Sequence, residues 1–294
     1  MSRNKKDQLK RKSFDAYQAR AFTVRWSVRF MLLIFTVITL YPLFWNIMSS
    51  FKSTEEILTS LTALPQGFAW DNYVRAFVAA NMGGYLLNSV ILVTLSLALL
   101  LILTVPCAYA IARYKFFGSK AIELLFAVCL FINTVYIYIP LFSLMHRLNM
   151  TDNLVALAVV YATISVPFAA FLLAGYMRGI SPSFEEAAKI DGCNNWQTLL
   201  KVVVPMAKPG IITIAMLNGI GFWNEYILAL VALRSPENRT LPVGLANLFE
   251  VQRRATDFGA LYAGLMIVLV PTLIVYFFGQ RYLTKGIAMG GVKE

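Results

Sequence analysis

The sequence predicts an all-α polytopic membrane protein with six transmembrane helices and both termini in the cytoplasm. Three observations lead to this fold class: the composition, the spacing of apolar stretches and the distribution of basic residues. Hydrophobic residues make up 59% of the 294 residues and charged residues only 14%, whereas a soluble domain carries about 25% charged residues. So few charges cannot cover a water-facing surface, which excludes soluble enzymes, nucleic-acid-binding domains and disulfide-stapled secreted modules.

Six stretches of the chain are apolar over a length that can cross a bilayer, since a helix needs about 20 such residues. Five contain no charged residue, and Glu225 is the one interruption in the sixth. The predicted spans lie in residues 30–51, 76–112, 124–145, 153–177, 209–233 and 258–280. We interpret the first as a retained span, because its apolar part is too long for a cleaved signal peptide and no small-residue cleavage pattern follows.

Basic residues predict the orientation, because Lys and Arg accumulate in short cytoplasmic loops. Of the 26 such residues, 19 fall in the amino-terminal arm, in alternate loops and in the tail. We expect the arm to be mobile or to lie on anionic lipid headgroups. The predicted organisation is a basic cytoplasmic arm (1–29), a first helix (30–51), an outward loop (52–84), a core with five helices (85–282) that includes an inward loop (178–208) and an outward loop (234–257), and a cytoplasmic tail (283–294).

The sequence lacks the residues that most enzyme and cofactor sites need. His146 is the single histidine, so neither a histidine-based metal site nor a Ser/His/Asp triad can form. The three cysteines fall in spans or in an inward loop, where no disulfide is expected. A phosphate-binding G-x-x-x-x-G-K-[ST] loop is missing as well. We therefore expect a protein that is not an enzyme and holds no cofactor, and that depends on a partner for any use of ATP.

The inward loop at 178–208 is much longer than a helical hairpin requires. Ser183 and Glu186 have the spacing of a capping box, which predicts the start of a short helix. Gly192 then supplies a residue that can leave the helix in a left-handed conformation. Asn194 or Asn195 can cap a second helix, whose apolar stripe faces the bundle and consists of Trp196, Leu199, Leu200, Val203 and Val204. Pro205 and Pro209 are expected to end this helix.

The spacing within this loop resembles the EAA loop of ABC-importer permeases. Glu186-Ala187-Ala188 is followed after three residues by Gly192 and after nine more by Val202-x-Val204-Pro205, where the family consensus is E-A-A-x3-G-x9-I-x-L-P. The exchanges at Val202 and Val204 are aliphatic for aliphatic. The alternative interpretation is that this helix–Gly–helix segment with small residues only fills space in the packing of the protein. The match in spacing makes that interpretation the weaker one.

Further segments resemble the carbohydrate-uptake branch of that family, with its maltose-type subunit of six spans. Each is weak alone, but they occur together and in order. They are Tyr41-Pro42-Leu43, Ser50-Phe51-Lys52-Ser53, Asn72-Tyr73, Trp223-Asn224-Glu225-Tyr226, Thr240 to Leu245 and Gly286 to Lys293. The resemblance implies a type I ABC-importer permease fold and the import of a sugar or oligosaccharide across a bacterial or archaeal cytoplasmic membrane.

The resemblance also implies partners and site residues. The partners would be a second permease subunit in a heterodimer, two ATP-binding ATPase subunits and an extracellular sugar-binding protein, with the lipid membrane around them and no nucleic acid. Coupling to the ATPase would involve Glu185, Glu186, Ala187, Ala188, Asp191, Gly192 and Pro205, and the tail residues Gly290, Gly291 and Lys293 would reach between the ATPase subunits. Two alternatives stay open: Glu186 acts only in its capping box, and the tail is only solvated.

Glu225 is the one carboxylate within a predicted span, and such a group is costly in a bilayer unless it faces water or a partner. With Trp223 and Asn224 it is therefore a candidate for the translocation pathway. A structural contact between the fifth span and a neighbouring helix explains it equally well.

Two other functions remain possible from the sequence. The first is a permease subunit for another solute class, such as amino acids, phosphate or metal chelates, because the EAA pattern is common to these importers. The second is an autonomous channel or secondary transporter. The EAA loop argues against the second, as does the lack of a visible inverted repeat.

Overall fold

The computed structural model describes residues 3–60, 62–255 and 257–291, and within these ranges the regular structure is entirely helical. Four of the elements are short 3-10 or π segments. The elements in chain order are α1 (Arg3–Ser50), α2 (Thr54–Thr59), α3 (Asp71–Val74), η1 (Arg75–Ala79), α4 (Met82–Arg113), α5 (Ser119–Cys129), η2 (Thr134–Ile137), α6 (Tyr138–Arg147), α7 (Leu154–Arg178), α8 (Ser183–Ile190), α9 (Asn195–Thr198), η3 (Leu199–Val203), α10 (Val204–Asn224), α11 (Ile227–Ala232), η4 (Pro236–Asn238), α12 (Leu241–Ala255) and α13 (Phe258–Gly291). The prediction of an all-α fold is confirmed.

Five of the predicted spans are present as helices that are long and apolar enough to cross a membrane. They cover Val24–Ser50, Met82–Arg113, Leu154–Arg178, Asn195–Asn224 and Phe258–Gln280 among the described residues. The third predicted span, 124–145, is not one helix, because α5 and η2–α6 meet at a bend of 100°. The Asn133 side chain accepts the Val135 N–H at 3.0 Å and so starts a new helix after the break. With this bent pair counted as one span, the total is six.

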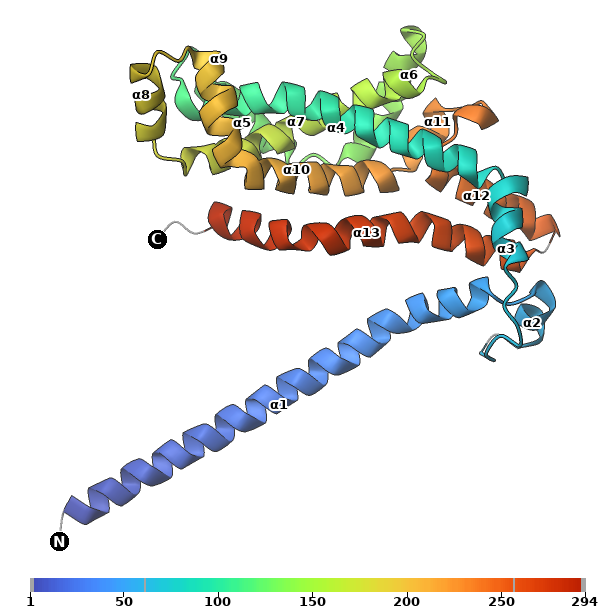
Figure 1. Cartoon of the computed structure of the whole chain (residues 1–294), viewed down its shortest axis with the longest axis horizontal. Coiled ribbons are helices and arrows are strands. Elements are labelled where there is room, and N and C mark those ends of the chain that lie inside the picture. The colour runs from blue at the N-terminus through green and yellow to red at the C-terminus, as the bar shows by residue number, and fades with distance from the viewer. Residues whose placement is uncertain (1–2, 61, 256, 292–294) are drawn as a thin grey trace.

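The spans α4, α7, α10 and α13 form the packed core of the molecule (Figure 1). Its buried side chains include Leu100, Tyr161, Leu173 and Ile214. Helices α7 and α10 approach closely at Gly210, where an added Cβ would lie 2.7 Å from the Tyr176 ring. Apolar helices in lipid gain stability mainly from such close packing.

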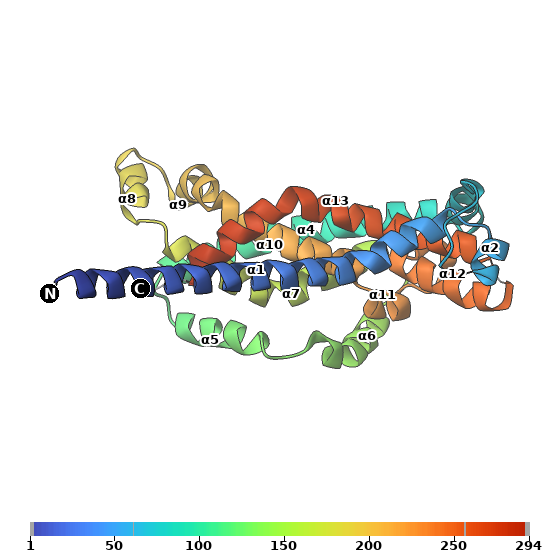
Figure 2. The ribbon, with the colours of Figure 1, turned by 90° about the horizontal axis from the view of Figure 1, so that it is seen from below.

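The two ends of the bundle carry different elements (Figure 2). The start of α1 and the end of α13 lie at the end that holds α8 and α9, whereas α2, α11 and α12 lie at the other (Figure 2). We call these the inner and the outer end, after the orientation that the basic residues predict. The arrangement agrees with the prediction that the arm, the long inward loop and the tail share one side.

Helix α1 diverges from the bundle and packs against it near the outer end, where Trp45 lies edge-on to Tyr262 with ring centroids 5.6 Å apart (Figure 1). The apolar part of this span, Val24–Met48, has no residue buried within the chain, and we call it the apolar window of α1; Ser49 and Ser50 at its outer end are buried. The predicted boundary between the arm (1–29) and the span (30–51) has no counterpart in the backbone, which is helical from Arg3 onward. Such an apolar surface needs lipid or another subunit around it.

A polar clamp at the outer end ties the loop after α1 to the start of α13. Arg75 donates from Nε to Asp257 Oδ2 at 2.8 Å and from Nη2 to Asn72 Oδ1 at 2.7 Å. Asn72 is buried and donates to the backbone carbonyls of Ser50 and Lys52, each at 2.8 Å. Burial raises the pKa of Asp257, but hydrogen bonds headed by the one from Arg75 outweigh it, so the pKa lies below its usual value. The clamp holds the start of α13, where Phe258 and Tyr262 line the outer cavity described below.

Candidate coupling hairpin and pathway residues

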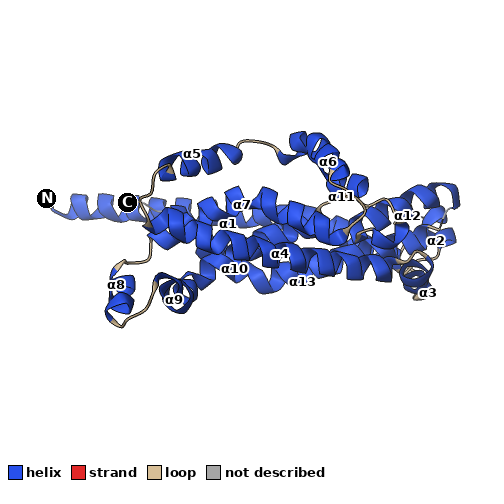
Figure 3. Cartoon of the chain, turned by 90° about the horizontal axis from the view of Figure 1, so that it is seen from above, coloured by secondary structure: helices blue, strands red, loops and turns tan. Residues whose placement is uncertain are grey.

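Helices α8 and α9 form a hairpin at the inner end that turns at Gly192 (Figure 3). Gly192 has a φ of +82°, so it occupies the left-handed region as predicted. Its N–H donates to the Lys189 carbonyl at 3.1 Å, and the Cys193 N–H donates to the Ala188 carbonyl at 2.9 Å. These two bonds form the pattern of a Schellman motif and satisfy the last carbonyls of α8.

The predicted capping box at the start of α8 is wrong. Ser183 is the first helical residue, and Pro182 before it already has helical backbone angles, with a φ of −59°. The Ser183 N–H donates instead to the Ser181 hydroxyl oxygen at 3.4 Å. Glu186 is therefore exposed and makes no cap. The expected cap of the second helix is present, because Asn194 and Gln197 form a reciprocal capping box with both bonds at 2.9 Å.

The predictions for the second helix of the loop are partly wrong. Leu199 and Val203 are buried as expected, but Trp196 is 63% exposed and Leu200 is 59% exposed. The π segment η3 rotates the helix at this point, so one regular stripe does not stay on one face. Pro205 does not end the helix but is the second residue of α10, directly after the π segment η3. Pro209 lies inside α10, which continues to Asn224.

Most of the predicted coupling residues lie on the surface of the hairpin. Glu186, Ala187, Asp191, Gly192 and Pro205 are exposed, and Ala188 is buried. Sequence reasoning did not place any large apolar side chain at this surface, because Phe184 and Ile190 were not singled out and Trp196 and Leu200 were expected to face the bundle. These four side chains are between 50% and 87% exposed. We call these four residues the apolar coupling face. Exposed apolar residues gathered at a water-facing end are typical of a protein interface.

Glu185 differs from the other coupling residues because it is only 7% exposed and is bonded within the chain. Its carboxylate accepts the Tyr109 hydroxyl at 2.9 Å and Arg113 Nε at 2.5 Å. Arg113 also donates from Nη2 to the Ile180 carbonyl at 2.7 Å. This cluster was not predicted from the sequence, because Arg113 directly follows an apolar stretch and is explained there as a topology signal.

The fifth predicted span, 209–233, is interrupted at the acidic residue within it. Helix α10 ends at Asn224, Glu225 has extended backbone angles, and α11 starts at Ile227. The Glu225 carboxylate accepts the backbone N–H groups of Leu228 at 2.8 Å and Ala229 at 3.0 Å. It thereby satisfies donors at the amino-terminal end of α11 that the break would leave without partners.

Glu225 also connects α11 with another element. The hydroxyl of Tyr161 on α7 donates to the carboxylate, and Tyr138 on α6 lines the same cavity as the carboxylate. The carboxylate thus accepts from three protein donors, which are the contacts that the structural alternative requires. Its position in the translocation pathway stays a prediction.

The three candidate pathway residues face three different cavities. Trp223 lines an apolar cavity of about 580 Å³ between α4, α10 and α13, and its indole N–H donates to the Val268 carbonyl at 3.3 Å. Asn224 lines an outer cavity of about 960 Å³. Glu225 lines a smaller cavity of about 300 Å³ with Tyr138 and Tyr161. The break after α10 turns the consecutive side chains in these different directions.

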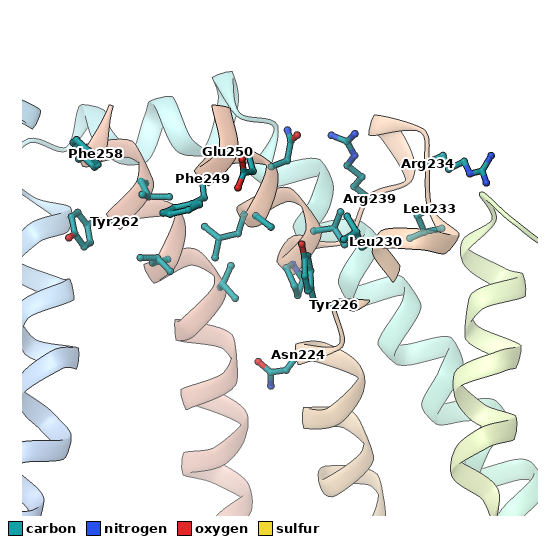
Figure 4. A pocket seen from close by; sticks show the side chains of 18 residues that line it. Asn224, Tyr226, Leu230, Leu233, Arg234, Arg239, Phe249, Glu250, Phe258 and Tyr262 are labelled. Carbon is teal, nitrogen blue, oxygen red and sulfur yellow. The ribbon is translucent and has the colours of Figure 1, made fainter. Parts of the chain in front are cut away.

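The outer cavity has a mixed polar and aromatic lining (Figure 4). One wall comes from α10 and α11, and the other comes from α12 and the start of α13. Its labelled side chains include Asn224, Tyr226, Arg234, Arg239, Phe249, Glu250, Phe258 and Tyr262. Rings with amides and charged groups between them can bind a polyhydroxylated solute.

The predicted tail contact lies at the end of α13. Gly290 and Gly291 are the last two residues of this helix, at the inner end of the molecule, and Lys293 lies outside the described residues. The helix passes the predicted boundary between core and tail at 282/283 without a break.

Comparisons with known proteins agree with the fold and with the motif in the hairpin. Residues 101–288 match the family described as binding-protein-dependent transport system inner membrane component. The diacetylchitobiose uptake system permease protein NgcG of Streptomyces coelicolor is 34% identical over 260 residues, which cover 88% of this chain and 86% of that protein. The arabinooligosaccharides transport system permease protein AraQ of Halalkalibacterium halodurans is 33% identical over 264 residues, which cover 87% and 92%.

A solved structure is similar over the same extent. It is the crystal structure of a bacterial ABC transporter involved in the import of the acidic polysaccharide alginate. One of its chains superposes with a TM-score of 0.77 at 28% identity, with 90% of this chain and 96% of that chain covered. The predicted ABC-importer permease fold is therefore confirmed, and the chain belongs to the family of binding-protein-dependent transport system inner membrane components.

Proposed function

We propose that this chain is a transmembrane permease subunit of an ABC importer for a sugar or oligosaccharide. It works with a second permease, two ATP-binding ATPase subunits and an extracellular sugar-binding protein in a bacterial or archaeal cytoplasmic membrane. The sugar assignment is supported by relatives whose names refer to diacetylchitobiose and arabinooligosaccharides. The outer cavity is consistent with it, since its lining combines aromatic rings with polar groups.

The observation that carries the proposal is the hairpin at the inner end. The EAA-type spacing from Glu186 to Pro205 lies on α8, on α9 and at the start of α10, with Gly192 at the left-handed turn. Small exposed residues lie beside the apolar coupling face. Such a surface suits a groove on an ATPase subunit, where ATP-driven closure would push the hairpin as a rigid body.

The second permease has a place in this proposal because much apolar surface is uncovered. The apolar window of α1 has no buried residue, and α5 has none either. These surfaces offer contact area to another membrane-embedded subunit. The translocation pathway would then run between the two permeases, with Asn224 and Glu225 on this chain's side.

Substitution of Ile190 by Asp tests the coupling assignment. Ile190 is 87% exposed, so the change leaves folding and membrane insertion intact. In an apolar interface it would bury a charge without a partner, which weakens binding strongly. We expect less ATPase subunit to co-purify with the permease and sugar uptake to fall in proportion.

Leu64→Asp is the matched control, because Leu64 is 70% exposed in the loop between α2 and α3 at the outer end. It should leave the ATPase content of the purified complex unchanged. Normal ATPase content and normal uptake in the Ile190→Asp complex would contradict the assignment of the hairpin.

A further inference from the structure

The buried cluster behind the coupling hairpin joins three parts of the chain. Tyr109 and Arg113 come from the last turns of α4, Ile180 from the turn after α7, and Glu185 from the first turn of α8. Side-chain exposure is 12% for Arg113 and 9% for Glu185, so the ion pair is shielded from water. We call these four residues the α4–α8 clasp.

The clasp is a rigid contact because its charged groups are held at more than one point. The Glu185 carboxylate accepts one bond on each oxygen, from Tyr109 and from Arg113. The Arg113 guanidinium bridges Glu185 and the Ile180 carbonyl. Charge-assisted bonds of this kind are stronger and more directional than bonds between neutral groups.

Helix α8 has few other attachments to the bundle. Of its eight residues, only Glu185 and Ala188 are buried. The side chain of Ala188 is a single methyl group, so it contributes little contact area with the bundle. A force applied to the exposed face of α8 would therefore pass into the bundle mainly through Glu185 and through the backbone at the two ends of the helix.

The α4 side of the clasp can pass such a force on to the rest of the bundle. Arg113 is the last residue of α4, and α4 packs along α7 more extensively than any other two elements pack together. Leu92 and Leu100 on α4 belong to the same buried cluster as Leu157 and Leu173 on α7. A displacement of the α4 end is therefore shared by two of the central spans.

We propose that Arg113 and Glu185 are positioning residues for coupling: they join the hairpin to α4 and transmit its movement to the α4–α7 pair. The inference rests on the proposed function and deepens it. Glu185 thereby acts inside the permease, while the exposed Glu186 beside it remains available to the ATPase. A buried ion pair need not add much stability, but it defines one arrangement of the two helices.

The test uses the complete transporter, expressed with its partner subunits and reconstituted in proteoliposomes. Arg113→Gln and Glu185→Gln each leave one buried charge without its partner, and the double variant removes both charges. In assembled complexes we expect each single variant to lower the number of sugars imported per ATP hydrolysed by about fivefold or more. The double variant should recover part of this ratio.

Glu123→Gln is the matched control. It removes the ion pair of Glu123 with Arg178, at 2.7 Å, which lies at the same end of the molecule but does not involve α8. Its ratio of sugar to ATP should equal that of the unchanged transporter. Tyr109→Phe removes a single bond to Glu185 and should lower the ratio in the same direction by less, which keeps the test usable if a charged variant fails to assemble.

A second measurement does not depend on the substrate. Spin labels at Lys189→Cys and Lys115→Cys, with Cys107, Cys129 and Cys193 replaced, report the distance between α8 and the end of α4; Lys189 is exposed on α8 and lies outside the apolar coupling face. We expect one narrow distribution in the unchanged clasp and a broad one in Arg113→Gln. Complexes that assemble with a normal ratio and a narrow distribution would overturn the inference. If the unchanged transporter fails to import any sugar, the proposed function falls, and the spin-label distances still decide the clasp.

Discussion

Carboxylates that receive backbone or side-chain donors mark several of the points where helices of this protein begin. Glu225 satisfies donors at the start of α11, Asp257 accepts the Ala260 N–H at the start of α13, and Glu185 lies in the first turn of α8. The first backbone N–H groups of a helix have no partner within it and favour negative charge. These acidic residues therefore stabilise helix starts that follow interruptions of the helical structure, whatever further role each one has.

Glu225→Ala should reduce the stability of the complex. It removes the acceptor for the Leu228 and Ala229 N–H groups and for the Tyr161 hydroxyl. The loss is about 1–3 kcal/mol for buried donors without partners. Glu225→Gln keeps one carbonyl acceptor and should recover part of it. Thermal unfolding and the yield of purified complex measure both effects.

Asn224→Ala is the control for that prediction, because Asn224 is exposed and its amide bonds only the Ile220 carbonyl of its own helix. Sugar uptake separates the two interpretations of Glu225. Normal yield with altered uptake in Glu225→Gln would place the carboxylate in the pathway. Unchanged yield and uptake in both Glu225 variants would contradict both roles.

Asp152 gives the outer end a dependence on pH. It accepts the N–H groups of Arg234 at 3.1 Å and Ser235 at 3.0 Å, together with the Ser235 hydroxyl. These bonds, led by the one from the hydroxyl, lower the pKa of Asp152. A lowered pKa means that the stabilisation is fully present above the unfolded value of about 3.9 and is lost as the pH falls through the lower folded value.

We expect Asp152→Asn to lower the melting temperature at pH 7 and to reduce its fall below about pH 4. The melting temperature of the solubilised complex between pH 7 and pH 3 measures this. Glu237→Gln changes an exposed carboxylate three residues beyond Arg234 and should follow the unchanged protein. Parallel curves for Asp152→Asn and the unchanged protein would contradict the assigned role of Asp152.

At the scale of elements, the sequence predicted where the spans lie but not where they break. Length and hydropathy predicted spans at 124–145 and 209–233, but the first is broken by a bend of 100° and the helix of the second covers Asn195–Asn224 and ends before α11. The interruptions depend on side chains that satisfy the freed backbone groups, such as Asn133 and Glu225, and on contacts with other helices. Periodicity carries no information about such tertiary contacts.

Two local predictions within the inward loop had opposite outcomes, one correct and one wrong. Gly192 was predicted correctly because a left-handed turn requires a particular backbone and depends on one residue. The end of the helix at Pro205 and Pro209 was predicted wrongly, because the helical segment Asn195–Asn224 continues through both prolines. Prolines are tolerated within membrane helices where local π segments such as η3 and neighbouring helices satisfy the freed backbone groups. The Arg113–Glu185 pair could not be predicted, since its partners are 72 residues apart and each has a simpler explanation from its neighbours.

Gly192→Val tests the turn between α8 and α9. No heavy atom lies within 4 Å of the position of an added Cβ, so the change acts through the backbone alone. A left-handed φ costs a branched L-residue about 1–2 kcal/mol. We expect the hairpin to shift and ATP hydrolysis to continue with reduced sugar uptake. Uptake and hydrolysis by the reconstituted transporter measure this.

Gly118→Val is the matched change, because Gly118 has a φ of +84° and also has open space around it, but lies between α4 and α5. It carries the same backbone strain away from the hairpin. Uptake per ATP should stay normal in this variant. Equal losses of coupling in the two glycine variants would show that strain in general, and not the geometry of the hairpin, causes the effect.

At the scale of the whole molecule, the chain has the surfaces of one part of a larger assembly. Its inner end presents the apolar coupling face, its outer end holds a cavity of about 960 Å³, and the apolar window of α1 is not buried within the chain. Each of these surfaces suits a different partner: an ATPase, a solute and a second permease. The chain alone is therefore expected neither to hydrolyse ATP nor to move solute.

The most direct test of this account is the uptake of labelled oligosaccharides by proteoliposomes that contain the complete transporter. Chito-, arabino- and alginate oligosaccharides are suitable probes, because the similar proteins are named for such solutes. The account predicts that uptake of at least one sugar requires ATP, the ATPase subunits and the binding protein together, and that liposomes with this chain alone show none. Sugar flux through this chain alone without ATP, or a complete transporter that drives only a non-sugar solute, would contradict it.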